Sequence, residues 1–228
     1  MIFKKIILFL LLFKLQLYGQ NTPIAISLGT VCPVAYVLRA QNIRTVAYPF
    51  DWVVVPFDGL YQTLEKDFSN FFQKKNLTMY VGPEFDGIID VESNFVFFHD
   101  FPILNRIRKD DVESGKIPSN FMDFYDEVYD KYLRRIYRFS NALNSFEKVI
   151  LIRYLATKNE AILLRDLFLS KYPLLDFILV IINDDVENRI YWDENLILNY
   201  YMPPANLWNS NSEDWLNIFY ETKLLQPQ

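Results

Sequence analysis

The chain contains only one cysteine and one histidine among its 228 residues, and only six glycines. A single cysteine cannot form an internal disulfide bond, so the fold depends on its apolar core. One cysteine and one histidine without metal-ligand spacing do not predict a metal site, and there is no glycine-rich phosphate loop. We therefore expect no metal and no cofactor.

A basic stripe is also absent. The chain has 23 Lys and Arg residues against 28 Asp and Glu residues, scattered among one another, with a net charge of -5. Proteins that bind nucleic acid concentrate positive charge against the phosphate backbone, so nucleic acid is not an expected partner. Hydrophobic residues make up 51% of the chain, which indicates a globular protein with a sizeable core.

The first segment, MIFKKIILFLLLFKLQLYGQ, has two lysines before a short apolar run at residues 6–13. A membrane-spanning helix needs about 20 apolar residues, so this run is too short. The positive start, the apolar middle and Gly19 predict a signal peptide over residues 1–19. We therefore expect a secreted, periplasmic or cell-envelope protein without a stable membrane span, or a membrane-tethered one if the leader is not cleaved.

The last third of the chain alternates strand, helix and strand, in KVILIRYLA, NEAILLRDLFLSKY and DFILVIIN. Continuous apolar strands are typical of a parallel sheet that is covered on both faces. PIAISLG predicts another buried strand, LTMYVG and SNFVFFHDFP are strand-like, and NFMDFYDEVYDKYLRRIYRFSNAL has the spacing of an amphipathic helix. We expect a single α/β domain over residues 20–228, a three-layer α/β sandwich with a mostly parallel sheet.

The lone cysteine and the lone histidine both follow predicted strands. Cys32 opens the predicted helix CPVAYVLRAQN, where Pro33 is acceptable in the first turn, and His99 ends NFVFFH. A helix N-terminus or a nearby imidazole can lower a thiol pKa from about 8.5 to between about 3.5 and 7.5. The strand ends of an α/β sheet are where ligands bind. The alternative is structural, because a lone cysteine is usually a small buried hydrophobe and a histidine makes useful hydrogen bonds anywhere.

A third residue would orient the imidazole, as an aspartate or asparagine does in thiol and serine hydrolases. The candidates are Asp51 in YPFDW, Asp100 beside His99 and, more weakly, Asp58. Neighbouring strand residues point to opposite faces, so Asp100 can serve His99 only if HDF forms a turn or bulge. The alternative for Asp51 is a turn in which its carboxylate accepts hydrogen bonds from backbone N–H groups.

Other charged residues lie at strand ends in the last third. Arg153 ends VILIR and Glu160 opens the next helix, which predicts a salt bridge, with an anion site as the alternative. Asp184 and Asp185 follow FILVIIN. Paired aspartates can hold a cation, but the chain offers no further ligands at a suitable spacing.

Four blocks resemble, in the same order, a bacterial family of unknown function described as papain-like cysteine peptidases. The blocks are ISLGTVCPVAYVLR, AYPFDWVVVPFDGLYQTLEKDF, FFHDF and VILIRYL, and the similarity runs from about Ile24 to about Asn183. The combination of S-L-G-x-x-C with P-F-D-W is more specific than either block alone. The resemblance implies a cysteine peptidase or a related thiol hydrolase.

Carried over to this chain, the resemblance implies Cys32 as nucleophile, His99 as base, and Asp51 or Asp100 as the orienting acid. The chain departs from the papain pattern because it lacks the Cys-Gly-Ser-Cys-Trp context and an upstream glutamine. Its Cys-to-His gap is about 67 residues, against about 130 in papain-like enzymes. These departures concern the peptidase activity more than the presence of a reactive thiol.

We predict a cysteine hydrolase of peptidase or acyl-transferase type, acting on a peptide, acyl or glycan substrate. Cys32 would attack a carbonyl carbon, His99 would take and return the proton, and N–H groups at the helix start would bind the oxyanion. The sequence does not predict an oligomeric state.

Two alternatives come from other classes of protein. The first is a non-catalytic cell-surface module that binds a glycan or a peptide through aromatic residues. The tryptophans available for stacking are Trp52, Trp192, Trp208 and Trp215. The second is a glycan-modifying transferase that uses Asp51 and Asp184 and needs no thiol.

Overall fold

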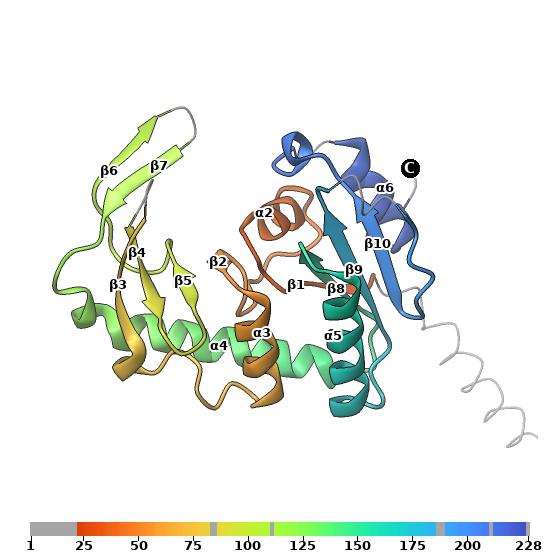
Figure 1. Ribbon diagram of the computed structural model, residues 1–228, viewed down its shortest axis with the longest axis horizontal. Coiled ribbons are helices and arrows are strands. Elements are labelled where there is room, and N and C mark those ends of the chain that lie inside the picture. The colour runs from red at the N-terminus through yellow and green to blue at the C-terminus, as the bar shows by residue number, and fades with distance from the viewer. Residues whose placement is uncertain (1–21, 83–85, 110–111, 186–189, 210–211, 227–228) are drawn as a thin grey trace, which may run out of the picture.

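Four parallel strands form the main sheet of the computed structural model (Figure 1). In sheet order they are β1 (Ile24–Ser27), β8 (Val149–Tyr154), β9 (Phe177–Asn183) and β10 (Ile197–Tyr201). The structure describes residues 22–82, 86–109, 112–185, 190–209 and 212–226, so the predicted signal peptide lies outside the described residues. The strands predicted from PIAISLG, KVILIRYLA and DFILVIIN are confirmed as β1, β8 and β9.

Helices cover both faces of this sheet. Side chains of β8 alternate between two apolar clusters, with Ile150 and Ile152 on one face and Val149 and Leu151 on the other. The first face packs against α2 (Pro33–Ala40) and α6 (Glu213–Glu221), and the second packs against α4 (Tyr125–Leu143) and α5 (Lys158–Lys171). This helix–sheet–helix layering confirms the predicted α/β sandwich, and continuous apolar strands are what a sheet buried on both faces requires.

A second, antiparallel sheet lies beside the first (Figure 1), which the prediction of a mostly parallel sheet does not include. Its strands, in sheet order, are β2 (Val53–Val54), β5 (Phe95–Phe97), β4 (Asp86–Asp90) and β3 (Leu77–Val81). A hairpin follows, formed by β6 (Leu104–Lys109) and β7 (Val112–Lys116). The edge strand β3 is largely exposed, with only Leu77 buried, whereas the inner strand β4 is buried at three of its five residues.

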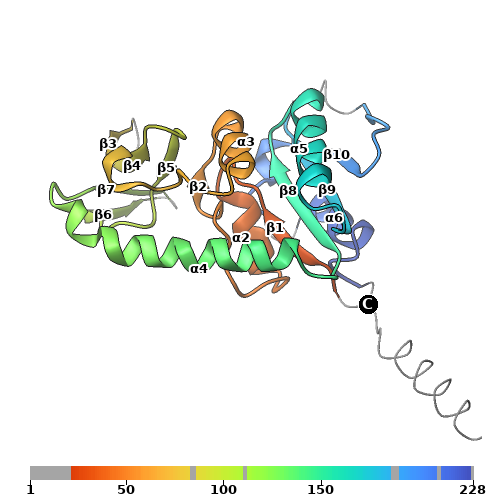
Figure 2. The ribbon, with the colours of Figure 1, turned by 90° about the horizontal axis from the view of Figure 1, so that it is seen from below.

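The long helix α4 joins the two sheets. Figure 2 shows it running along both the antiparallel and the parallel sheet. Its Tyr132 is fully buried and contacts the rings of Phe71, Phe72 and Phe97, so the antiparallel sheet shares the apolar core of the parallel one. No helix among the described residues is long and apolar enough to cross a lipid bilayer.

The remaining helices are short. α3 (Phe57–Glu65) packs against the turn between β4 and β5, where Gly59 is needed because a Cβ there would lie 2.0 Å from the carbonyl oxygen of Ser93. Three single 3-10 turns complete the described helices: η1 (Lys74–Asn76), η2 (Phe121–Phe124) and η4 (Pro204–Asn206).

Candidate active site

Cys32 lies at the N-terminus of α2, which a turn at residues 28–31 joins to the carboxyl end of β1. It is the N-cap residue, and the N–H group of Tyr36 donates to its carbonyl oxygen over 3.0 Å, the first hydrogen bond of the helix. The N–H groups of Cys32, Val34 and Ala35 precede this bond and therefore have no acceptor within the helix. Together with the helix dipole, they make this end of α2 suited to negative charge.

The turn that leads to Cys32 has an unusual backbone. Gly29 and Thr30 have φ angles of +78° and +81°, a region that glycine adopts freely and a β-branched residue does not. A Cβ at Gly29 would lie 2.6 Å from a methyl group of Val55, and the N–H of Val55 donates to the carbonyl of Thr30 over 3.3 Å. The start of α2 is therefore fixed against the end of β2.

Arg153 stabilises the same turn through hydrogen bonds to its backbone. Its buried guanidinium donates to the carbonyl oxygen of Leu28 over 2.9 Å and to that of Val55 over 3.1 Å. Burial lowers the pKa of Arg153 to about 10, which leaves it charged at neutral pH. The predicted salt bridge to Glu160 is wrong, because the Glu160 carboxylate instead accepts from the N–H of Thr157 over 2.7 Å in the capping box of α5.

His99 reaches the same place from the antiparallel sheet. It lies in a bend directly after β5, is exposed to solvent, and has its Nε2 3.7 Å from the Sγ of Cys32. Strand β2 pairs with β5 through Val53 and Phe97, which brings Trp52 beside His99 with ring centroids 6.1 Å apart at an angle of 85°. The two residues that occur once in the chain therefore meet where the two sheets adjoin.

Asp100 directs its side chain away from solvent and toward α4. Its buried carboxylate accepts from the hydroxyl of Tyr132 over 2.7 Å and pairs with Lys131 over 2.7 Å and with Arg135 over 3.5 Å. The bend at residues 98–100 removes the constraint that a regular strand would place on Asp100 and His99. The contacts given by the structure anchor the His99 segment on α4.

Asp51 has the turn role that the sequence left open as an alternative. Its buried carboxylate accepts hydrogen bonds from both terminal nitrogens of Arg44, over 2.6 and 2.7 Å, and from the N–H of Tyr48 over 2.8 Å. This bidentate pair fixes the segment that precedes Trp52. Asp58, the weaker candidate, lies exposed in the first turn of α3.

The electrostatic environment keeps the Cys32 thiol protonated. Burial, followed by the negative charge of Asp100 and then that of Asp51, raises its pKa to about 12, although the N–H group of Cys32 itself acts in the opposite direction. The expectation from the sequence that the helix N-terminus lowers the pKa of the Cys32 thiol is therefore wrong for the free protein.

The remaining candidates do not form a metal or carboxylate site. Asp184 accepts a hydrogen bond from the hydroxyl of Tyr154, while Asp51 is held by Arg44, so each carboxylate of the transferase hypothesis has a protein partner. Within the described ranges, no group of three or more His, Cys, Asp or Glu side chains could hold a metal ion.

The three tryptophans other than Trp52 divide between core and surface. Trp215 is fully buried and Trp192 packs against the core, whereas Trp208 is 54% exposed and contacts Tyr36 edge to face, with ring centroids 5.8 Å apart. The sequence pattern did not single out Tyr36, and it assigned Arg153 to a salt bridge rather than to the carbonyl groups of Leu28 and Val55. Two features of the sequence could have indicated their roles. Tyr36 follows Cys32 by four residues, and Arg153 is an arginine inside the apolar strand VILIRY.

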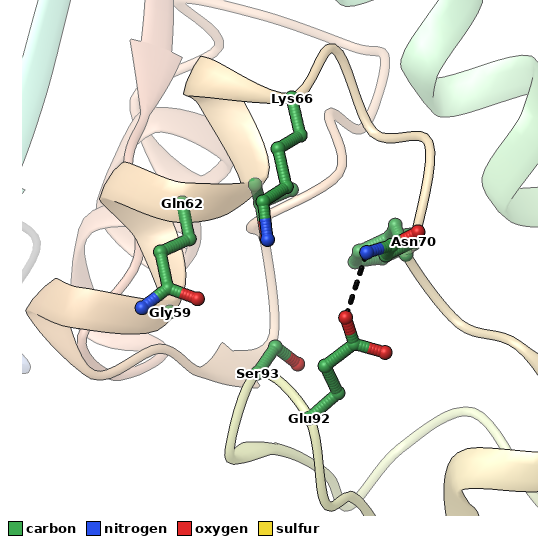
Figure 3. Close-up of a pocket in the computed structure, with 8 residues that line it drawn as sticks. Gly59, Gln62, Lys66, Asn70, Glu92 and Ser93 are labelled. Atoms are coloured by element: carbon green, nitrogen blue, oxygen red, sulfur yellow. Dashed lines mark hydrogen bonds between the residues drawn. The ribbon is translucent and has the colours of Figure 1, made fainter.

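A pocket between α3 and the β4–β5 turn shares no residue with this site (Figure 3). At its edge the amide of Asn70 donates to the carboxylate of Glu92 over 2.7 Å. It is lined by Gly59, Gln62, Thr63, Lys66, Asn70, Phe71, Glu92 and Ser93. Four of these side chains, Gln62, Lys66, Asn70 and Glu92, are exposed, and neither Cys32 nor His99 is among the lining residues.

Residues 24–186 match the protein family described as "Putative papain-like cysteine peptidase (DUF1796)". The chain belongs to this family. It is also 28% identical over 222 residues to "Uncharacterized protein R408" of Acanthamoeba polyphaga mimivirus, an alignment that covers 86% of this chain and 93% of the relative. No solved structure matches the chain. The family resemblance seen in the sequence is confirmed, but a restriction to bacteria is not, since this relative is viral.

Proposed function

We propose that the protein is a cysteine hydrolase in which Cys32 is the nucleophile and His99 the general base. The observation that carries the proposal is the 3.7 Å separation between Sγ and Nε2 at the N-terminus of α2. A base must come within about 3 Å of the group whose proton it takes, and such contacts are often longer without substrate. Membership of a family described as papain-like cysteine peptidases supports the same reaction class.

The raised thiol pKa sets the order of events. At neutral pH the resting pair is a neutral thiol beside an imidazole, because burial and Asp100 disfavour the thiolate. As Sγ attacks the carbonyl carbon of the substrate, Nε2 of His99 removes the thiol proton. The carbonyl π electrons move to oxygen, and the N–H groups at the start of α2 stabilise the oxyanion.

Collapse of this tetrahedral intermediate breaks the bond to the leaving group, which takes the proton from His99 and leaves a Cys32 thioester. Water then attacks the thioester carbonyl while His99 removes one of its protons. The acid is released and the thiol is restored. An amine or alcohol in place of water would give acyl transfer by the same steps.

Hydrolysis of p-nitrophenyl acetate by the purified protein tests this proposal. We expect Cys32→Ala to abolish the burst of p-nitrophenol and the acetyl adduct on the Cys32 peptide, and His99→Gln to lower the rate by about 100-fold or more. Thr78→Ala, an exposed change on β3, is the control. Hydrolysis that persists in Cys32→Ala at the rate of the wild-type protein would refute the assignment.

A further inference from the structure

We propose that Tyr36 and Trp208 form a carbohydrate-binding platform beside Cys32, and that the substrate is an acylated glycan. This inference rests on the proposed thiol chemistry and names the compound on which it acts. No other group of exposed aromatic residues in the described chain contains a member one helical turn from the nucleophile.

The position of Tyr36 follows from helix geometry. It lies four residues after Cys32, and the hydrogen bond from its N–H to the Cys32 carbonyl shows that the helical geometry includes both residues. Residues spaced by four share a helix face, and helical side chains lean toward the N-terminus. The ring of Tyr36 therefore lies over the turn that carries the Cys32 thiol.

Trp208 is brought to Tyr36 from the opposite edge of the parallel sheet. It follows η4 in the segment between β10 and α6, which lies beside α2 in Figure 1. The preceding Leu207 is buried in the same cluster as Val34 of α2, and the Asn206 amide donates to Asp214 over 2.7 Å. The two rings then meet edge to face at 62°. Trp208 is thus exposed while its backbone is anchored.

The exposure of the two rings favours a sugar over an apolar side chain. Tyr36 is 40% and Trp208 54% exposed, so together they form an open surface. An apolar peptide side chain gains most from an enclosed pocket that removes it from water. A pyranose ring instead presents a C–H face that stacks on an aromatic ring, while its hydroxyl groups stay in contact with water.

A further tryptophan, Trp52, lies beside His99. Trp52 packs edge to face against the imidazole, and Asp51 before it is held by Arg44. One aromatic ring therefore lies beside the proposed base, and Tyr36 lies on the helix that begins at the proposed nucleophile. An extended glycan could contact these rings while its acyl carbonyl lies at Sγ.

Binding is tested in the Cys32→Ala protein, so that no turnover occurs, with cellotetraose and chitotetraose as probes and tryptophan fluorescence as the readout. We expect the further changes Tyr36→Ala and Trp208→Ala each to weaken binding by about fivefold or more, the range that aromatic stacking contributes. Tyr137→Ala, which removes a 68% exposed tyrosine from α4, should change nothing. Absence of binding by both oligosaccharides, or binding that ignores Tyr36 and Trp208, would overturn the platform.

Catalysis supplies the second readout, in the protein with Cys32 intact. We expect Trp208→Ala to raise KM for glucose pentaacetate by about fivefold or more, and to lower kcat/KM on this ester far more than on p-nitrophenyl acetate. Cys32-dependent hydrolysis of p-nitrophenyl acetate without this selective loss, or a preference for a phenylalanine ester over the sugar ester, would leave the thiol chemistry standing and refute the glycan. Trp208-dependent oligosaccharide binding without any Cys32-dependent hydrolysis would instead refute the proposed enzyme and retain the platform.

Discussion

The two sheets hold their halves of the candidate site by different means. On the parallel side, Cys32 is fixed through its backbone by the turn at Gly29, by the start of α2, and by Arg153, which binds main-chain carbonyls. On the antiparallel side, His99 leaves β5 in a bend, and the neighbouring Asp100 is fixed through its side chain by ion pairs and a hydroxyl on α4.

This difference predicts different sensitivities. A backbone anchor inside an apolar core has no alternative partner, so its loss leaves buried carbonyl groups unpaired. A carboxylate with three partners retains two when one is removed. We therefore expect changes beside Cys32 to act mainly on stability, and changes beside His99 to act mainly on the titration and reactivity of the site.

The largest effect is expected from Arg153→Met. It leaves the carbonyls of Leu28 and Val55 without their donor, and each unsatisfied buried acceptor costs about 1 to 3 kcal/mol, so the free energy of unfolding should fall by about 2 to 5 kcal/mol. Urea denaturation measures this. The control is Arg165→Met, which removes ion pairs that are more exposed to solvent than the hydrogen bonds of Arg153. It should cost about 1 kcal/mol or less. Equal losses in the two variants would contradict the backbone-anchor interpretation.

The next effect is a pair of opposite shifts in the turn before Cys32. Gly29→Ala places a Cβ against Val55 at a positive φ and should lower the free energy of unfolding by about 1 to 3 kcal/mol. Thr30→Gly relieves the positive φ of a β-branched residue and should raise it by a smaller amount, about 1 kcal/mol. Differential scanning calorimetry of both proteins would show Tm moving in opposite directions; two losses would exclude strain at Thr30.

The same contrast explains which parts of the fold could be predicted from the sequence. The parallel half was predictable because β8 and β9 are continuous apolar runs separated by a capped helix, so their structure is local. The position of Cys32 at the start of α2 follows from the same pattern. The antiparallel sheet depends on pairings such as Val53 with Phe97, which no local pattern specifies.

The candidate site was predictable as a set of residues but not as an arrangement. Cys32 and His99 stood out because each occurs once, yet their 3.7 Å contact depends on how two sheets adjoin. An aspartate after an aromatic residue has the same local appearance whether it orients an imidazole or closes a turn, so the ion pair of Asp51 with Arg44 could not be foreseen. The rise in the Cys32 pKa likewise depends on burial and on charges distant in sequence.

Asp100→Asn should separate thiol acidity from catalysis. Burial raises the Cys32 pKa most and the Asp100 charge raises it next, so removing the charge should lower that pKa from about 12 and speed alkylation by iodoacetamide between about pH 8 and 10. Ester hydrolysis should slow, because the imidazolium formed on His99 loses a nearby negative charge. Asp130→Asn, an exposed change on the same helix α4, is the control. A fall in both rates would instead indicate a displaced Cys32 or His99.

The smallest effect is expected from Tyr132→Phe, which removes one of the three partners of Asp100 and leaves Lys131 and Arg135 in place. Loss of this hydrogen bond should cost only about 0.5 to 1 kcal/mol, because the carboxylate keeps its other two partners. Since the aromatic ring is kept, the packing against Phe71 and Phe97 is unchanged. Urea denaturation measures the cost, and Tyr137→Phe, at an exposed site on α4, is its control. A cost as large as that of Arg153→Met would show that the His99 half depends on one buried contact as strictly as the Cys32 half, and the contrast between the two sheets would not hold.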